Sequence, residues 1–128
     1  MLKGLEIIFK ALGETTRLKI VKLVADRELC VCEIVAVLGT NQPRVSQHLK
    51  VLKAAGILEE RKERQWSFYR LNQEFREGLV RQYIDYMKAD IRDLKEFAHE
   101  VEHLDGLAGN EEVNACKNTP LQIIKRAE

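Results

Sequence analysis

The chain has 128 residues, 45% of them hydrophobic, which is enough for one domain with a modest core. No run of about 18 apolar residues occurs, which excludes a membrane-spanning helix, and we expect no membrane partner. The net charge of only +1 argues against a strongly basic nucleic-acid-binding protein, but residues 41–58 carry basic side chains and no acidic ones, so the charges are segregated along the chain.

Helical periodicity dominates the first 55 residues. Apolar residues from Leu5 to Leu12 recur at the spacing of one helix face and predict a first helix, in a pattern unlike a secretory signal, so we expect a cytoplasmic protein. A second helix is expected over residues 14–24 and a third over 31–38, the latter stopped by Gly39. A fourth follows Asn41, a good N-cap residue, and ends before Gly56.

The period then changes. Residues 58–62 and 65–71 are two extended runs around a charged turn and predict a β-hairpin. One long helical pattern returns from Gln73 to about Leu104. The expected fold is mainly α with a β-hairpin wing, a winged helix-turn-helix domain over residues 1–104. Residues 105–128, which include Cys116, are expected to form a flexible C-terminal tail.

The fourth predicted helix has the composition of a helix that reads DNA. Val45, Leu49 and Leu52 would seat one side on the core. The other side carries groups that bond base edges or phosphates, and the basic hairpin turn would add phosphate contacts. A solvated helix face beside a charged hairpin is the alternative, but the cap, the turn, the acid-free stretch and the wing occur in order. The predicted contacts with double-stranded DNA are Gln42, Arg44, Ser46, Gln47, His48, Lys50, Arg61, Lys62 and Arg64.

Two of the three cysteines, Cys30 and Cys32, form a C-x-C pair, and an odd, sparse set of this kind predicts free thiols rather than a disulfide framework. Thiolates favour soft metal ions, and arsenite shares that preference for sulfur. Side chains at i and i+2 of a regular helix point about 200° apart, so both can hold one ion only where the helix start is distorted. The alternative is one buried and one exposed structural cysteine. A structural Cys₄ zinc site within one chain is excluded by the count.

Taken together, these motifs resemble the ArsR/SmtB family of winged-helix, homodimeric repressors of metal-resistance operons. The resemblance covers roughly Leu5–Asn72 and rests on four stretches in fixed order: Thr15–Ile20, Glu28–Glu33, Asn41–Leu52 and Ala55–Leu58. It implies that Cys30 and Cys32 form an arsenite-sensing box, where As(III) or Sb(III) binds as inducer and weakens DNA binding. It also implies a near-palindromic operator, no enzymatic activity and no organic cofactor. The implied dimer interface is Leu5, Ile8, Phe9, Phe75, Leu79 and Tyr83.

Two departures from the family pattern concern metal ligands. The arsenite box often has a third cysteine where this chain has Val35. Since As(III) favours three sulfur ligands, we expect Cys116 of the same or the partner subunit to complete the site; the alternative is solvent or another small ligand. Zinc-sensing relatives use Asp, His and Glu on the long helix. Here His99 and Glu102 match only half of that motif, so we expect no zinc site there.

Other functions compete with arsenite sensing. A sensor of Cd(II), Pb(II) or Zn(II), or a thiol redox switch that pairs Cys30 or Cys32 with Cys116, would keep the same fold. An enzyme with a cysteine nucleophile and His48 or His99 as base would need a nucleophile motif and a Gly-rich oxyanion loop, which the sequence lacks. A protein-interaction module built on the long helix would form no salt-dependent, sequence-selective complex with DNA.

Overall fold

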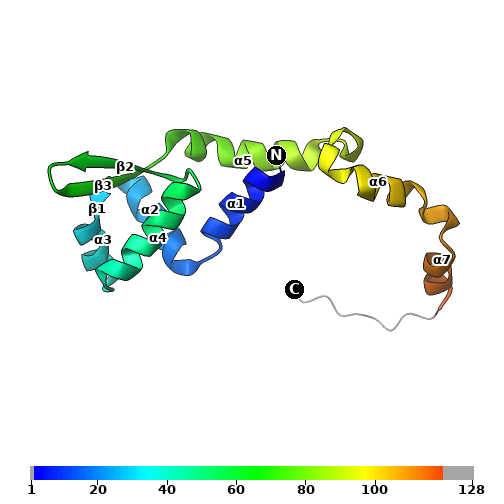
Figure 1. Ribbon diagram of the computed structural model, residues 1–128, viewed down its shortest axis with the longest axis horizontal. Helices are drawn as coiled ribbons and strands as arrows, with labels where there is room; N and C mark the ends of the chain where they lie inside the picture. Colours follow the sequence, from blue (N-terminus) through cyan, green and yellow to red (C-terminus); the bar gives the residue numbers. More distant parts are fainter. Residues whose placement is uncertain (1, 120–128) are drawn as a thin grey trace. The chain divides into compact units, whose positions relative to one another are not determined.

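The computed structural model describes residues 2–119, and their contacts divide them into two compact units with the boundary between Lys88 and Ala89. The first unit contains α1 (Leu2–Leu12), α2 (Thr15–Asp26), β1 (Leu29–Cys30), α3 (Val31–Leu38), α4 (Gln42–Ala54), β2 (Leu58–Glu63), β3 (Trp66–Leu71) and α5 (Gln73–Lys88) (Figure 1). The second contains η1 (Ile91–Asp93), η2 (Lys95–Phe97), α6 (Ala98–Asp105), η3 (Leu107–Gly109) and α7 (Glu111–Asn118). No helix within residues 2–119 has the length and apolar character needed to cross a membrane.

The core of the first unit lies between α2, α3, α4 and the strands. Ile20 of α2 and Ile34 of α3 are completely buried. Val45, Leu49 and Leu52 of α4 are 0%, 1% and 0% exposed, which confirms that the apolar spacing of this helix seats it on the core. The opposite side of α4 is therefore held at the surface in a fixed orientation.

Local signals in the sequence set the ends of the helices. The Asn41 side chain accepts a hydrogen bond from the Arg44 backbone N–H at 3.0 Å and caps α4, as predicted. Gly39, with φ of 66°, ends α3 in the left-handed region, where other residues are strained. The turn between α3 and α4 is thus defined by a glycine at one end and a cap at the other.

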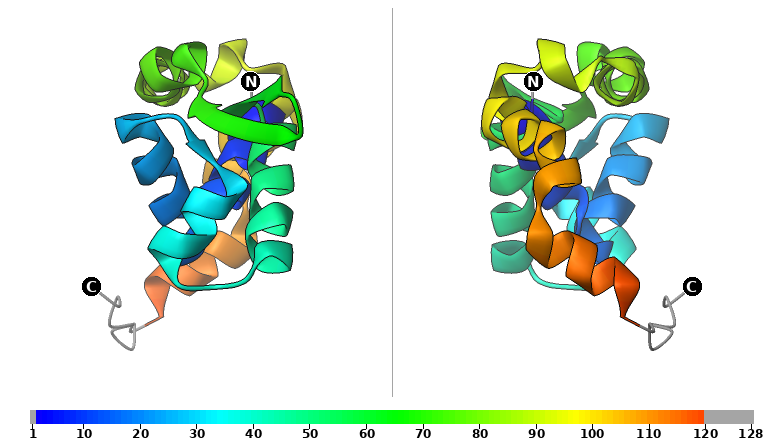
Figure 2. Two further views of the ribbon diagram at one scale, coloured as in Figure 1. Left: turned by 90° about the vertical axis from the view of Figure 1, so that its left-hand side faces the viewer. Right: turned by 90° about the vertical axis from the view of Figure 1, so that its right-hand side faces the viewer.

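The strands form a three-stranded antiparallel sheet in the order β1-β3-β2 (Figures 1 and 2). The β2–β3 hairpin is the predicted wing, and it turns at Arg64, whose φ is 58°. Strand β1 was not predicted from the sequence. It is only two residues long, and its Leu29 and Cys30 pair with Tyr69 and Phe68 of β3. Strand β3 of the wing is therefore hydrogen-bonded to β1, the segment that leads into α3.

The prediction of one continuous helix from Gln73 to Leu104 is wrong. Helix α5 ends at Lys88, and the carboxylate of Asp90 accepts a hydrogen bond from the Arg92 backbone N–H at 2.9 Å to begin η1. Asp competes with helix hydrogen bonds in this way, so it interrupts a helix although the apolar spacing continues on both sides. In the second unit, Arg92 forms two bonds to Asp105 at 2.9 and 2.5 Å, which tie η1 to the end of α6.

Much of the predicted flexible tail has regular structure. Residues 105–118 include η3 and α7, and Asn110 caps α7 by accepting a hydrogen bond from the Val113 N–H at 3.0 Å. Residues 120–128 lie outside the described part of the chain. The domain boundary after Leu104 stays a prediction.

Candidate DNA-reading surface and cysteine site

The predicted DNA contacts on α4 face outward. Gln42, Arg44, Ser46, Gln47 and Lys50 are all exposed, while the apolar residues between them are buried. This separation follows from the helical period and from the Asn41 cap, which fixes where the helix begins. The exposed side offers donors and acceptors of the types that bond base edges and phosphates, and the contact of these residues with DNA stays a prediction.

Beside this side of α4 lies a hollow of about 500 Å³ between the start of α2, the α3–α4 turn and α4. Three of its lining residues, Thr16, Lys19 and Thr40, bring hydroxyl and ammonium groups next to Arg44, and such groups bind phosphate. Thr16 and Lys19 were not predicted from the sequence because the packing of α2 on α4 brings them there, and Thr40 reaches the hollow from the α3–α4 turn. The full lining is Glu14, Thr16, Lys19, Leu38, Gly39, Thr40, Arg44, Gln47 and His48.

His48 differs from its neighbours on α4 because it is half-buried against α2. Its Nδ1 lies 3.4 Å from Arg17 Nη1 and 3.8 Å from Glu14 Oε2. The Arg17 backbone N–H, which bonds to Glu14 at the start of α2, lowers the pKa of that carboxyl. His48 therefore joins α4 to α2, and its contact with DNA stays a prediction.

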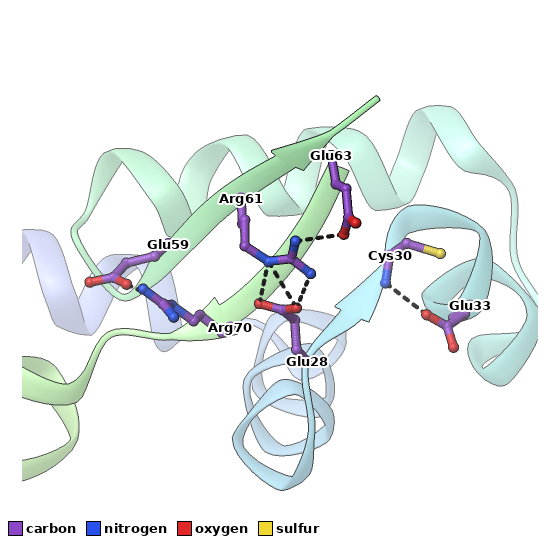
Figure 3. Close-up of polar contacts among 7 residues, drawn as sticks. All are labelled: Glu28, Cys30, Glu33, Glu59, Arg61, Glu63 and Arg70. Atoms are coloured by element: carbon purple, nitrogen blue, oxygen red, sulfur yellow. Dashed lines mark hydrogen bonds and ion pairs between the residues drawn. The ribbon is translucent and has the colours of Figure 1, made fainter. Parts of the chain in front are cut away.

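Two of the basic residues on the wing, Lys62 and Arg64, are exposed at or beside its turn. Arg61 is different, because Nη2 lies 2.6 Å from Glu28 Oε1 and Nη1 lies 2.7 Å from Glu63 Oε2 (Figure 3). Its guanidinium carbon also stands 4.7 Å from the centroid of the Phe68 ring. The prediction that Arg61 binds a DNA phosphate is untested, and its two carboxylate partners argue against it.

The two cysteines stand where β1 becomes α3. Cys30 is 7% exposed and is the N-cap residue of α3, with extended backbone angles of φ −87° and ψ 166°. Cys32 is exposed in the first turn of the helix. Since Cys30 lies outside the helix, the 200° separation of a regular helix does not apply to the pair. The helix start at which both cysteines could hold one ion is a strand-to-helix junction.

Glu33, in the first turn of α3, stabilises the junction between β1 and α3. The Cys30 backbone N–H donates a hydrogen bond to Glu33 Oε1 at 3.0 Å, which is one half of a capping box (Figure 3). The same bond lowers the pKa of the Glu33 carboxyl. The cysteine pair thus lies at the start of α3, which Glu33 of the first helical turn caps.

By donor type, two thiols fit a soft, thiophilic ion, but the described residues of the first unit supply no third thiol. Cys116 lies on α7 of the second unit and is exposed. Within residues 2–119, no three His, Cys, Asp or Glu side chains are close enough together to hold a metal ion. No third metal-binding side chain of the described residues therefore joins His99 and Glu102. The role of Cys116 as a ligand stays a prediction.

The residues of the predicted dimer interface lie on α1 and α5, which also carry exposed apolar side chains, and their role in dimerisation stays a prediction. Phe9 and Tyr83 are 47% and 44% exposed, and their rings meet edge to face with centroids 5.9 Å apart. Leu5 differs, because it is only 3% exposed and packs inside its own protomer. The other predicted residues, Ile8, Phe75 and Leu79, are half-buried. Exposed apolar residues of α5 that the prediction omitted are Val80, Ile84 and Met87.

Several known proteins are similar to this chain in sequence. A family model described as bacterial regulatory protein, arsR family, matches residues 14–60. The chain is 42% identical over 88 residues to the arsenic resistance transcriptional regulator ArsR1 of Pseudomonas putida, which is 68% of this chain and 65% of that protein. It is 35% identical over 100 residues to ArsR2 of the same species, 77% of this chain and 87% of that protein. It is 38% identical over 74 residues to a cadmium resistance regulatory protein CadC homolog of Staphylococcus aureus, 57% and 61% of the two chains. The chain thus spans less than two thirds of the length of ArsR1 and of the CadC homolog.

A solved structure shares the fold as well. The homodimeric winged helix-turn-helix DNA-binding domain of a regulator from Mycobacterium bovis, determined by NMR, matches with a TM-score of 0.58 and 30% identity. The match covers 69% of this chain and 84% of that one. The winged helix-turn-helix fold predicted from the sequence is confirmed.

Proposed function

The chain belongs to the arsR family of bacterial regulatory proteins, and we propose that it represses an arsenical- or metal-resistance operon and leaves its operator when As(III) or Sb(III) binds the thiolates of Cys30 and Cys32. The observation that carries this proposal is the place of the two cysteines. They stand at the start of α3, and α3 packs against α4, the helix with the DNA-reading surface. A ligand that reshapes the start of α3 therefore acts on the helix next to the DNA.

In the DNA-bound state, α4 enters the major groove and the wing approaches the neighbouring backbone. A homodimer formed through the apolar surface of α1 and α5 presents two such helices, about one helical turn (~34 Å) apart, to a near-palindromic operator. The exposed Phe9, Val80 and Met87 support this use of the surface, since a monomer rarely leaves so many large apolar side chains together in water. The dimerisation of the M. bovis domain supports it as well.

Inducer capture replaces hydroxyl groups of arsenous acid by sulfur. Each As–S bond forms as one hydroxyl leaves as water with the thiol proton, so two cysteines leave one position on arsenic for hydroxide, solvent or a third thiol. Because Cys30 is buried at the junction, bonding it together with Cys32 pulls on the first turn of α3. An effective response needs a coupling free energy of about 1–3 kcal/mol, or about 5–150-fold in DNA affinity, and linkage requires DNA to weaken inducer binding by the same factor.

The test is fluorescence anisotropy of a labelled duplex from the promoter of the protein's own gene, bound by reduced protein and titrated with arsenite. Wild type is expected to release the duplex and Cys30→Ser to retain it. Serine is a preferred N-cap residue, so this variant keeps the start of α3. Cys116→Ser is the matched thiol control, and unchanged arsenite affinity and stoichiometry in it would remove Cys116 from the site. A wild-type complex that ignores arsenite would overturn the inducer assignment while leaving the DNA-binding fold in place.

A divalent thiophilic ion is the second candidate inducer, favoured by the similarity to the CadC homolog. Cadmium in place of arsenite in the same titration separates the two. A redox switch is a third, and recovery of the complex by reductant alone, without a chelator, would identify it.

A further inference from the structure

We propose that Glu28 and Arg61 are positioning residues for the inducer response, because they tie the wing to the strand that carries Cys30. Ligand binding at the cysteines then displaces the wing as well as α4. This inference rests on the proposed function, since it takes a ligand at Cys30 and Cys32 as its starting point.

The sheet connects the cysteine directly to the wing. Cys30 of β1 pairs with Phe68 of β3, and Phe68 pairs in turn with Arg61 of β2. These three residues therefore occupy one row across the three strands. Because β1 is hydrogen-bonded to β3, a shift of the Cys30 backbone moves an edge of the same sheet to which both wing strands belong.

A strand pair of two residues is a weak connection by itself, and the Glu28–Arg61 pair reinforces it. Glu28 lies two residues before Cys30, and its carboxylate receives the Arg61 guanidinium at 2.6 Å from Nη2 and at 3.2 Å from Nε (Figure 3). The Arg61 side chain thus reaches from β2, over Phe68 of the central strand, to the segment before β1. This contact lowers the pKa of the Glu28 carboxyl, which keeps the pair charged at neutral pH.

The pair bridges the two parts that the proposed response must connect. On one side is the five-residue stretch Glu28–Cys32, which ends at the second cysteine. On the other is the wing, with Lys62 and Arg64 exposed for phosphates. The guanidinium of Arg61 is paired with Glu28 and Glu63. Arg61 therefore affects DNA binding through the position of the wing and not as a phosphate ligand.

The chain supplies a matched control. Glu63 also binds Arg61, at 2.7 Å, but it lies on the same strand two residues away, so its bond does not leave the wing. Glu63→Gln and Glu28→Gln remove the same charge beside the same guanidinium. Of these two variants, only Glu28→Gln weakens the ion pair that reaches from the wing to the segment before β1. Arg61→Lys is a further variant, because it keeps the positive charge and loses the planar fork that holds two carboxylates.

The wing also carries a built-in probe. Trp66, the only tryptophan of the chain, is the first residue of β3, pairs with Glu63 and is 45% exposed. Its emission reports the surroundings of the wing independently of DNA. Loss of free thiols, measured with a thiol reagent, reports arsenite binding independently of Trp66 emission and of DNA binding.

The experiment uses the full-length reduced protein and compares wild type, Glu28→Gln, Arg61→Lys and Glu63→Gln, with urea unfolding as the check on folding. We expect arsenite to occupy the thiols of all four proteins and to change Trp66 emission in wild type and Glu63→Gln. In Glu28→Gln and Arg61→Lys, the ratio of DNA affinities without and with arsenite is expected to fall about two- to five-fold, the size expected for a partly exposed ion pair, and the Trp66 response is expected to shrink with it.

Three results would overturn the inference. Folded Glu28→Gln and Arg61→Lys proteins with the wild-type ratio and the wild-type Trp66 response would show that the pair transmits nothing. A Glu63→Gln protein with the same loss would show a local charge effect on the wing. Wild-type protein whose thiols or DNA complex do not respond to arsenite would overturn the proposed function, and this inference with it.

Discussion

Replacing Tyr69 by phenylalanine removes one hydroxyl from a junction of three elements. The Tyr69 hydroxyl of β3 donates a hydrogen bond to Glu60 Oε2 of β2 at 2.7 Å, and Lys53 Nζ of α4 lies 2.9 Å from the other oxygen, Oε1. One carboxylate thus holds the end of α4 and both wing strands together. Tyr69→Phe leaves the packing of the ring intact and takes away one of the two partners of Glu60.

The loss can be sized from burial and charge. Tyr69 is 9% exposed and the Glu60 side chain is 15% exposed, so water replaces the lost bond poorly. A hydrogen bond to an ionised group contributes about 1.5–3 kcal/mol to the free energy of unfolding. For a domain of the size of the first unit, each kcal/mol corresponds to about 4–8 °C in Tm.

The pH dependence gives a second signature. Burial, and then the bond to Glu60, raise the pKa of Tyr69 from 10.0 to about 12. The protonated tyrosine is therefore favoured by folding, and its contribution is complete below pH 10 and is lost as the pH rises from 10 to 12. This loss amounts to roughly 2–3 kcal/mol in wild type and is absent in Tyr69→Phe.

Urea unfolding at one fixed protein concentration measures the loss of stability, and tyrosinate absorbance measures the titration. Wild type is expected to gain more tyrosinate absorbance than Tyr69→Phe as the pH rises from 10 to 12, and the difference belongs to Tyr69. Glu60→Gln serves as the comparison, because it keeps an acceptor but no charge. If Tyr69→Phe is as stable as wild type, or if the two proteins gain the same tyrosinate absorbance between pH 10 and pH 12, the reasoning about this junction is refuted.

Two further predictions concern the turn before α4. Gly39→Ala is expected to cost about 1–2 kcal/mol in the free energy of unfolding because φ is 66°, while the added Cβ would meet no atom within 4 Å. Gly39→Asn should lose less. Equal urea midpoints for wild type, Gly39→Ala and Gly39→Asn would contradict this. Asn41→Ala removes the cap on the Arg44 N–H and is expected to cost about 0.5–2 kcal/mol and to weaken DNA binding measured by anisotropy, whereas Asn41→Ser should retain both. Asn41→Ala binding DNA as tightly as wild type would show that the cap does not position α4.

Elements fixed by local chemistry could be predicted from the sequence. The buried side of α4, its Asn41 cap and the glycine at the end of α3 are all visible as residue types at fixed spacing. The wing was predicted because its two strands are neighbours in sequence. The exposed positions on α4 followed from the period alone.

Features made by distant partners could not be predicted. β1 is a strand only because β3 pairs with it, and two residues are too short to show an alternating pattern. Glu28 and Arg61 are 33 residues apart, so nothing local marks them as a pair. The break after α5 was missed for another reason, since the apolar spacing continues through it and only Asp90 signals the change.

Under the proposed function, the unequal burial of the two cysteines sets the order in which a ligand bonds to them. Cys32 is open to water, whereas Cys30 is 7% exposed, so the first bond forms at Cys32 by simple collision and the second waits for the junction to open. A reagent that can form only one bond to sulfur stops at the first stage and leaves Cys30 in place. The burial of Cys30 slows the response and also makes it selective for ligands that can bond to two sulfur atoms. Arsenite is such a ligand, whereas monofunctional electrophiles that attack exposed thiols are not.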